Sequence, residues 1–275
     1  MAETFGSALR QRRLHRQWSQ LVLAQEAGSS ARHLSCLETG KALPGRELVL
    51  QLAAVLDVPL REANVWLLLA GHAPHYREQP LHHPRMAAAR ATVDLVLRRY
   101  EPWPAIAIDR HWNIVASNRM VALLLSTLPS PSSWTMPINA VRLSLSPQGL
   151  APAIVNQRAW FRAIRQRLRQ QAIASRDPAL HALCKMVDDA TAERHLDDDD
   201  VTPTTDGDDL LMPLVLRTGW GELRLLTTVT VFGSPVEVTL QELALETFLP
   251  ADEATAAALR TAYDALAVDA SPTSP

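Results

Sequence analysis

The sequence predicts a multidomain protein of the α plus α/β class, in which a helical bundle precedes a larger α+β domain with a five-stranded antiparallel sheet. At 275 residues the chain is long for a single domain. Apolar residues recur at helical spacing up to about residue 71. Beyond residue 100, short alternating stretches come before and after a helical region, as expected for strands separated by helices.

The stretch from Ser19 to Gly40 has the spacing of a helix-turn-helix. Ser19 and Ser30 can each cap a helix, because a hydroxyl accepts a hydrogen bond from a free amide of the first turn. Between the two helices, a glycine suits a tight or left-handed turn. The motif requires a small residue at the helix crossing, this turn glycine and two apolar anchors, and the sequence supplies them as Ala24, Gly28, Leu34 and Leu37.

Three further helical stretches surround this motif. They are residues 5–16, 47–56 and 60–71. In the first we expect Phe5, Leu9 and Leu14 to face inward, while its arginines occupy the other faces. Five helices within residues 1–72 predict a compact helix-turn-helix domain.

Composition and charge limit the function classes. The net charge of −2 excludes a globally basic nucleic-acid binder, but residues 1–60 hold seven Arg and Lys against five Asp and Glu. The remainder of the chain therefore carries the acidic excess. Cys36 and Cys184 match no metal or disulfide spacing. No apolar run approaches the roughly 20 residues of a membrane span, and we expect a cytoplasmic protein without a membrane partner.

Side chains at the start of the second helix of the motif are expected to face the major groove of DNA. Arginine can bridge O6 and N7 of guanine, so Arg32 is the candidate for base readout, with Ala31 against a thymine methyl group. Polar residues at the first helix N-terminus and cations beyond the motif are placed for phosphate contacts. The predicted DNA-binding set is Ser19, Gln20, Ser30, Ala31, Arg32, His33, Ser35, Lys41 and Arg46. For His33, an ordinary surface position remains the alternative.

Residues 73–95 are predicted to form a linker and a connecting helix. Four histidines lie in the Pro-rich stretch H-A-P-H-Y-R-E-Q-P-L-H-H-P-R. Neutral imidazoles bind zinc, but neither a cysteine nor an i, i+4 pair of histidines accompanies them. We therefore expect an exposed connector and no metal site.

Residues 96–268 are predicted to form the α+β domain, followed by a frayed tail at 269–275. Strands are expected at 103–108, 112–116, 211–217, 222–232 and 236–245. In the last of these the apolar parity shifts, and a bulge near Gln241 would reconcile its two halves. Helices are expected at 118–127, 157–174, 177–187 and 251–268. The acidic stretch 196–209 lacks calcium-loop spacing and predicts a solvated loop.

Several motifs of the N-terminal part occur together in one known family. L-R-Q-R-R lies in the first helix, A-x-x-x-G in the turn, and L-S-C-L-E-T-G-K ends the motif. In these features the N-terminal 70 residues resemble the Cro/C1-type (Xre-like) regulators. The resemblance implies a lambda-repressor-like bundle in which Glu38 pairs with an arginine of the first helix, by position Arg13.

The C-terminal part contains P-A-I-A-I-D-R-H-W-N-I-V-A-S-N, N-A-V-R-L-S-L-S-P-Q-G-L and T-V-T-V-F-G-S-P-V-E-V-T-L-Q-E-L. These stretches resemble the MmyB-like regulator ligand-binding domain. The resemblance implies a PAS-like fold that binds an apolar small molecule, with fatty acids the leading class. The candidate cavity residues are Trp160, Phe161, Ile164, Leu225, Val229 and Phe232, which would otherwise simply form the core. Arg142 or Arg162 is the candidate partner of a ligand carboxylate.

The predicted function is sequence-specific transcription regulation controlled by an apolar ligand. In the alternative, the C-terminal domain only dimerises or binds a protein partner. The chain shows no nucleophile elbow, phosphate loop, metal constellation or paired acid motif, and we predict no catalytic residues, no cofactor and no enzyme activity. We expect a homodimer, because one small helix-turn-helix unit reads only a half-site.

Overall fold

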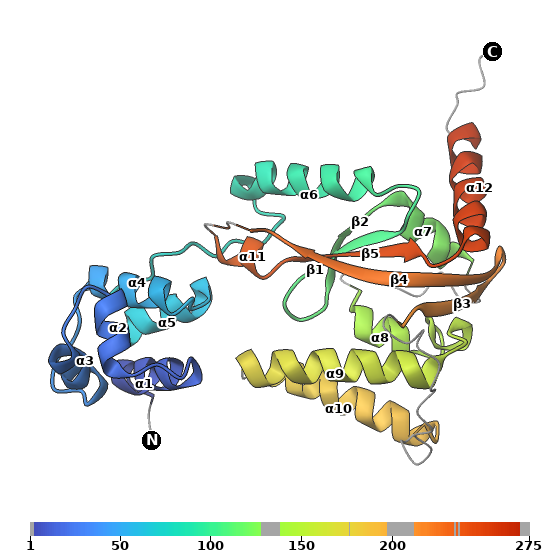
Figure 1. Cartoon of the computed structure of the whole chain (residues 1–275). Coiled ribbons are helices and arrows are strands. Elements are labelled where there is room, and N and C mark those ends of the chain that lie inside the picture. The colour runs from blue at the N-terminus through green and yellow to red at the C-terminus, as the bar shows by residue number, and fades with distance from the viewer. Residues whose placement is uncertain are drawn as a thin grey trace. The chain divides into compact units, whose positions relative to one another are not determined.

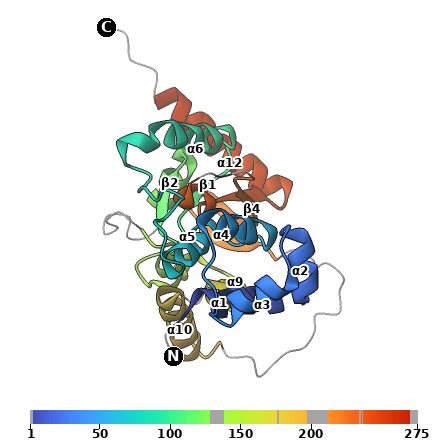
Figure 2. The same ribbon diagram turned by 90° about the vertical axis from the view of Figure 1, so that its left-hand side faces the viewer.

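The computed structural model describes residues 3–127, 138–175, 177–196, 212–233, 235 and 237–269. It divides into two compact units (Figures 1 and 2). The first unit consists of residues 1–83 and 232–241, and the second of residues 84–231 and 242–275. The predicted acidic loop, apart from Leu196, and the predicted tail beyond Asp269 lie outside the described residues.

The first unit contains the predicted helices. They are α1 (Phe5–His15), α2 (Gln20–Glu26), α3 (Ala31–Glu38), α4 (Arg46–Val55) and α5 (Leu60–Leu69). Their apolar faces meet in one core, in which Leu9, Leu23 and Trp66 are buried. Leu14 was expected in this core, but its side chain is 53% exposed. Leu14 follows Leu9 by five residues, which turns it about 140° around the helix from the buried face.

A segment from the C-terminal half of the sequence completes this unit. Between the strands β4 (Gly221–Val231) and β5 (Ala244–Pro250) of the second unit, residues 238–241 form the short helix α11 (Val238–Gln241), which packs on α5. Val238 is fully buried and donates its backbone N–H to the Arg77 carbonyl at 2.9 Å. The Gln241 side chain accepts a hydrogen bond from Leu60 N at 2.7 Å, at the first residue of α5.

The second unit is the α+β domain. Its strands are β1 (Ala105–Ile108), β2 (Ile114–Ser117), β3 (Leu214–Thr218), β4 (Gly221–Val231) and β5 (Ala244–Pro250). Its α-helices are α6 (Ala87–Arg99), α7 (Arg119–Ser126), α8 (Ala140–Leu145), α9 (Gln157–Ser175), α10 (Pro178–Glu193) and α12 (Glu253–Asp269). Short 3-10 turns occur at Pro84–Met86 and Ala151–Ala153. In both ribbon views α6 lies on one side of the sheet, and α9 and α10 lie together on the other.

Within the described residues, the five strands form one antiparallel sheet in the order β2-β1-β5-β4-β3. The first two strands of the chain pair with the last, so β5 lies in the centre of the sheet. This arrangement confirms the predicted sheet of a PAS-like domain. The core between the sheet and helices α7–α10 includes Ile108, Met120, Phe161 and Leu223.

The predicted strand at residues 236–245 is wrong. Residues 238–241 are helical, and the strand begins only at Ala244 and continues to Pro250. The parity shift near Gln241 therefore marks a change of secondary structure and not a bulge. Leu245 is buried and pairs with Ala107 of β1.

Of the helices in the described ranges, none combines the length and apolar character needed to cross a membrane.

Candidate DNA-recognition surface and ligand cavity

The helix-turn-helix is held by two serine caps and one turn glycine. Ser19 Oγ accepts from Val22 N at 3.1 Å, and Ser30 Oγ accepts from His33 N at 3.1 Å. Gly28 adopts a positive φ of 54°, a conformation that side-chain-bearing residues rarely take. These contacts fix the start of α3, and with it the direction of the side chains that begin the helix.

A buried ion pair joins α1 to the end of α3. Arg13 donates from Nε to Glu38 Oε1 at 2.6 Å and from Nη2 to Glu38 Oε2 at 2.8 Å. Gln20 adds a third hydrogen bond to Glu38 Oε2 at 2.8 Å. Burial alone would raise the pKa of Glu38, but the hydrogen bonds from Arg13 and Gln20 outweigh it and lower that pKa below its ordinary value. The pair expected from the family resemblance is present.

Gly6 allows α1 to approach α3 closely, a contact that the sequence patterns did not single out. A Cβ atom at Gly6 would lie 2.3 Å from the Leu37 carbonyl oxygen and 2.8 Å from that of Glu38. Both obstacles are backbone atoms, which cannot rotate away. A glycine three residues before the inward-facing Leu9 is a weak sequence signal, because glycine has many other uses.

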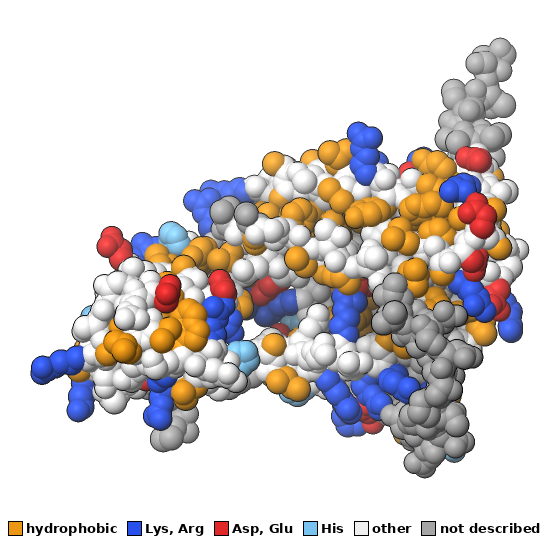
Figure 3. All heavy atoms as spheres, in the orientation of Figure 1, with side chains coloured by type: hydrophobic (Ala, Val, Ile, Leu, Met, Phe, Trp, Pro, Cys, Tyr) orange, Lys and Arg blue, Asp and Glu red, His pale blue; other side chains and the backbone are white. Residues whose placement is uncertain are grey.

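Five of the predicted DNA-contacting residues lie at the N-cap of α3 or on α3 itself. Ser30, Arg32 and His33 are exposed, and Ala31 and Ser35 are half-buried. On the face shown in Figure 3, several Lys and Arg side chains project from the helical unit. The start of α3 thus presents an arginine, a small apolar side chain and hydroxyls, the residue types that read base edges in a major groove.

Of the other predicted DNA-contacting side chains, some are exposed and others are hydrogen-bonded within the protein. Lys41 is exposed, whereas Arg46 bonds His75 Nδ1 through Nη2 at 2.8 Å. The Gln20 amide group is directed to Glu38, and the Ser19 hydroxyl to Val22 N. Arg46, Gln20 and Ser19 therefore have intramolecular partners.

The second unit contains an apolar cavity of about 70 Å³ between the sheet and its helices. The cavity is lined by side chains from all five strands and from α7, α8 and α9. Nearly all of these side chains are apolar. Trp160, Ile164 and Leu225, three of the predicted cavity residues, are among them.

The other predicted ligand residues lie elsewhere. Phe161 is fully buried, but it belongs to the core behind the cavity, where the Arg194 guanidinium lies over its ring. Val229, on β4, is 47% exposed and does not line the cavity. Phe232 belongs to the first unit. Arg142 is exposed and does not line the cavity, and the same holds for Arg162.

Among the described residues, one charged side chain lines this cavity, and sequence reasoning missed it. Glu246, in the centre of the sheet on β5, is 4% exposed and forms an ion pair with Arg167 of α9. Burial raises the pKa of Glu246, although Arg167 opposes this rise. The Arg167 guanidinium also lies over the ring of Trp112, 4.4 Å from its centroid. A glutamate between Leu245 and Thr247 in an alternating strand looks like an outward-facing residue, so the sequence gives no signal of its burial.

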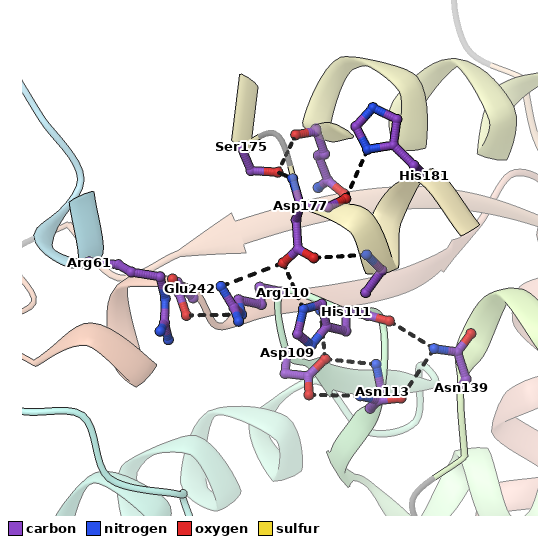
Figure 4. Close-up of polar contacts among 12 residues, drawn as sticks. Arg61, Asp109, Arg110, His111, Asn113, Asn139, Ser175, Asp177, His181 and Glu242 are labelled. Atoms are coloured by element: carbon purple, nitrogen blue, oxygen red, sulfur yellow. Dashed lines mark hydrogen bonds and ion pairs between the residues drawn. The ribbon is translucent and has the colours of Figure 1, made fainter. Parts of the chain in front are cut away.

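Polar and charged side chains of the β1–β2 turn contact Asp177 at the start of α10 (Figure 4). Asp177 caps α10 by accepting from Ala179 N at 2.9 Å, and its other oxygen lies 2.8 Å from His111 Nε2. Arg110 lies 3.6 Å from the same oxygen. Burial opposes ionisation of Asp177, but the hydrogen bonds from His111 and Ala179 lower its pKa. These contacts thus anchor the α9–α10 pair, whose first helix forms a cavity wall, to the turn that carries Trp112.

Among the described residues, no group of three or more His, Cys, Asp or Glu side chains is arranged to hold a metal ion. In the predicted connector, His72 Nε2 lies 3.0 Å from the Pro44 carbonyl oxygen.

A helix-turn-helix bundle joined to a PAS-like domain with an apolar cavity defines a ligand-responsive transcription regulator. Residues 4–66 match the family model of a helix-turn-helix domain. Residues 89–262 match the model of the MmyB-like transcription regulator ligand binding domain, and the chain belongs to that family. The two models describe regulatory domains, a helix-turn-helix domain and a ligand-binding domain. No curated protein matches the chain.

Proposed function

We propose that this regulator reads a DNA operator through α3 and binds an apolar molecule of the fatty-acid class in the cavity of its C-terminal domain. The observation that supports ligand binding most directly is the cavity, because its lining is almost wholly apolar and lies inside the domain. DNA binding is supported by the capped and rigidly held α3, whose first turn exposes Arg32.

Base readout and backbone contact are separable by two substitutions. Arg32→Ala should reduce the difference in affinity between the operator and unrelated DNA, because it removes a base contact. Lys41→Ala should weaken binding to all sequences by a similar factor and lower the salt dependence. Fluorescence anisotropy with the operator and a scrambled duplex, at several salt concentrations, measures both quantities. Equal losses from both variants on both duplexes would contradict the placement of α3 in the groove.

Operator binding is proposed to involve two copies of the chain. A single helix-turn-helix unit contacts one half-site, and two half-sites about one helical turn apart require a dimer. Light scattering of the free protein and of its operator complex tests this stoichiometry. A complex with one protein per operator would exclude the dimer.

Ligand binding requires the cavity to enlarge. A drug-sized ligand occupies a pocket of roughly 300 Å³ or more, whereas the cavity measures about 70 Å³. A bound chain must therefore separate the cavity walls, which are formed in part by β4 and β5. The connection between these two strands includes residues 232–241, which belong to the helical unit. A ligand that favours the enlarged state thereby has a continuous chain connection to the DNA-binding unit.

The alternative function, a C-terminal domain that only dimerises or binds a partner, is favoured by one observation. Val229 and Val231 on the far half of β4 are 47% and 62% exposed and offer an apolar strip. Mass spectrometry of organic extracts from the purified full-length protein separates the two functions. A co-purifying apolar molecule that changes operator affinity supports sensing. A protein that carries none and does not respond to added fatty acids, fatty alcohols or fatty esters supports the alternative.

A further inference from the structure

We propose that the ligand of this cavity is bound with an uncharged head group, whose oxygen accepts a hydrogen bond from Trp160 Nε1. This inference rests on the proposed function and specifies the ligand further. It predicts an ester, amide, alcohol or un-ionised acid in place of a carboxylate anion.

The first observation is an indole N–H without a partner. Trp160 lines the cavity, and its Nε1 is buried with no hydrogen-bond acceptor among the described residues. A buried donor that lacks an acceptor is costly, because folding has removed its water without replacement. A ligand oxygen placed at this nitrogen would remove that cost.

The other side-chain hydrogen-bond donors of the described lining, Trp112 and Ser144, already have acceptors within the protein. The Trp112 indole Nε1 donates to Gln171 Oε1 at 2.7 Å, and the Ser144 hydroxyl donates to the Ala140 carbonyl oxygen at 2.9 Å. Trp160 is therefore the side-chain donor left for a ligand among the described residues of the lining.

The second observation concerns charge. The described lining contains no Arg, Lys or His side chain, and its one charged member is Glu246. The nearby cation, Arg167, is already paired with Glu246. A ligand carboxylate entering the cavity would leave two carboxylates to share one guanidinium in an apolar surrounding, which is unfavourable. An uncharged oxygen meets no such penalty.

The test uses the full-length protein at about pH 8 and four ligands of equal chain length: octanol, methyl octanoate, octanoate and octane. Displacement of an environment-sensitive apolar dye measures each affinity. Octanol and methyl octanoate should bind at least about tenfold more tightly than octanoate, which is ionised at this pH. Trp160→Phe should weaken binding of the ester about fivefold, the effect of one hydrogen bond, and leave octane unchanged.

A gain of binding provides the control against misfolding. Glu246→Gln removes the carboxylate while nearly keeping its shape, so Arg167 becomes an unpaired cation near the cavity. Octanoate should then bind about tenfold more tightly than it binds the unchanged protein. A partly unfolded variant cannot produce this selective gain.

The outcomes separate the two levels of the proposal. If octanoate binds the unchanged protein most tightly, and Trp160→Phe affects ester and hydrocarbon alike, the uncharged head group is refuted while apolar ligand binding stands. If none of the four compounds displaces the dye or binds, the proposed ligand function itself fails. Preference for the neutral oxygens, with its loss in Trp160→Phe, supports the inference.

Discussion

Arg13 on α1 and Glu38 at the end of α3 form a bidentate ion pair, with nitrogen to oxygen distances of 2.6 and 2.8 Å. Their side chains are only 9% and 3% exposed. Gln20 on α2 bonds the same carboxylate, so three helices meet at one buried charge. The orientation of α3 therefore depends on a buried ion pair at its C-terminal end.

Glu38→Gln should lower the free energy of unfolding of the helical unit by about 3 kcal/mol, because Arg13 would keep its charge in a buried place. The folded-state pKa of Glu38 is lowered, so its contribution is present above its ordinary pKa and is lost as the pH falls through the folded-state pKa. Urea unfolding at neutral and acidic pH measures both effects.

The exposed pair between Arg16 and Asp57 is the matched control. The Asp57 side chain is 76% exposed. Asp57→Asn should therefore change the unfolding free energy by less than about 1 kcal/mol, since exposed ion pairs contribute little. Similar losses of unfolding free energy from both variants would show that the buried Arg13–Glu38 pair contributes no more to stability than an exposed ion pair.

Gly6→Ala should destabilise the helical unit by about 2 kcal/mol or more and reduce operator affinity. The added Cβ would meet the Leu37 carbonyl oxygen at 2.3 Å, so α1 and α3 must separate. Gly45→Ala introduces the same methyl group where no atom lies within 4 Å, at the N-cap of α4. We expect a cost below about 1 kcal/mol there. Thermal unfolding and operator titration compare the two variants.

Phe161→Ala should destabilise the C-terminal domain by about 3–5 kcal/mol, because it leaves a cavity at a fully buried core position. Ile173→Ala on the same helix should cost less than about 0.5 kcal/mol, since Ile173 is 76% exposed. Urea unfolding followed by tryptophan fluorescence reports both values. A small cost for Phe161→Ala would argue that this ring borders free space.

Asp177→Asn should reduce the acid sensitivity of the C-terminal domain. The pKa of Asp177 is lowered in the folded state, so its charge stabilises the fold above the ordinary pKa and ceases to do so as the pH falls through the folded-state pKa. The effect should be about 1 kcal/mol at neutral pH, because asparagine caps a helix as well as aspartate does. We expect the unfolding midpoints of the two proteins to converge once the pH lies below the folded-state pKa of Asp177. A constant offset between them at all pH values would point to lost packing and not to the charge.

The helical unit was largely predictable from local patterns. The serine caps, the Gly28 turn and the anchors Leu34 and Leu37 act within a few residues of one another. Their spacing is therefore visible in the sequence. The Arg13–Glu38 pair was reached only through family resemblance, since its partners lie 25 residues apart.

The cavity was predicted in part. Trp160 and Ile164 stand one turn apart on α9, so helical periodicity placed them on one face. Strand alternation likewise placed Val229 on the same face as Leu225, but Val229 is 47% exposed. Alternation shows which residues share a face of a strand, and it does not show how far along the strand that face is covered.

The sequence by itself determined most of the helices and strands, the helix-turn-helix and the two-part organisation, because these depend on local spacing and composition. Only the tertiary structure decided that Glu246 and Arg167 pair beside the cavity and that residues 232–241 belong to the helical unit. Both depend on which distant segments meet. Burial of a charge in the middle of a sheet is stable only when a partner from another element arrives there, and no local pattern encodes that partner.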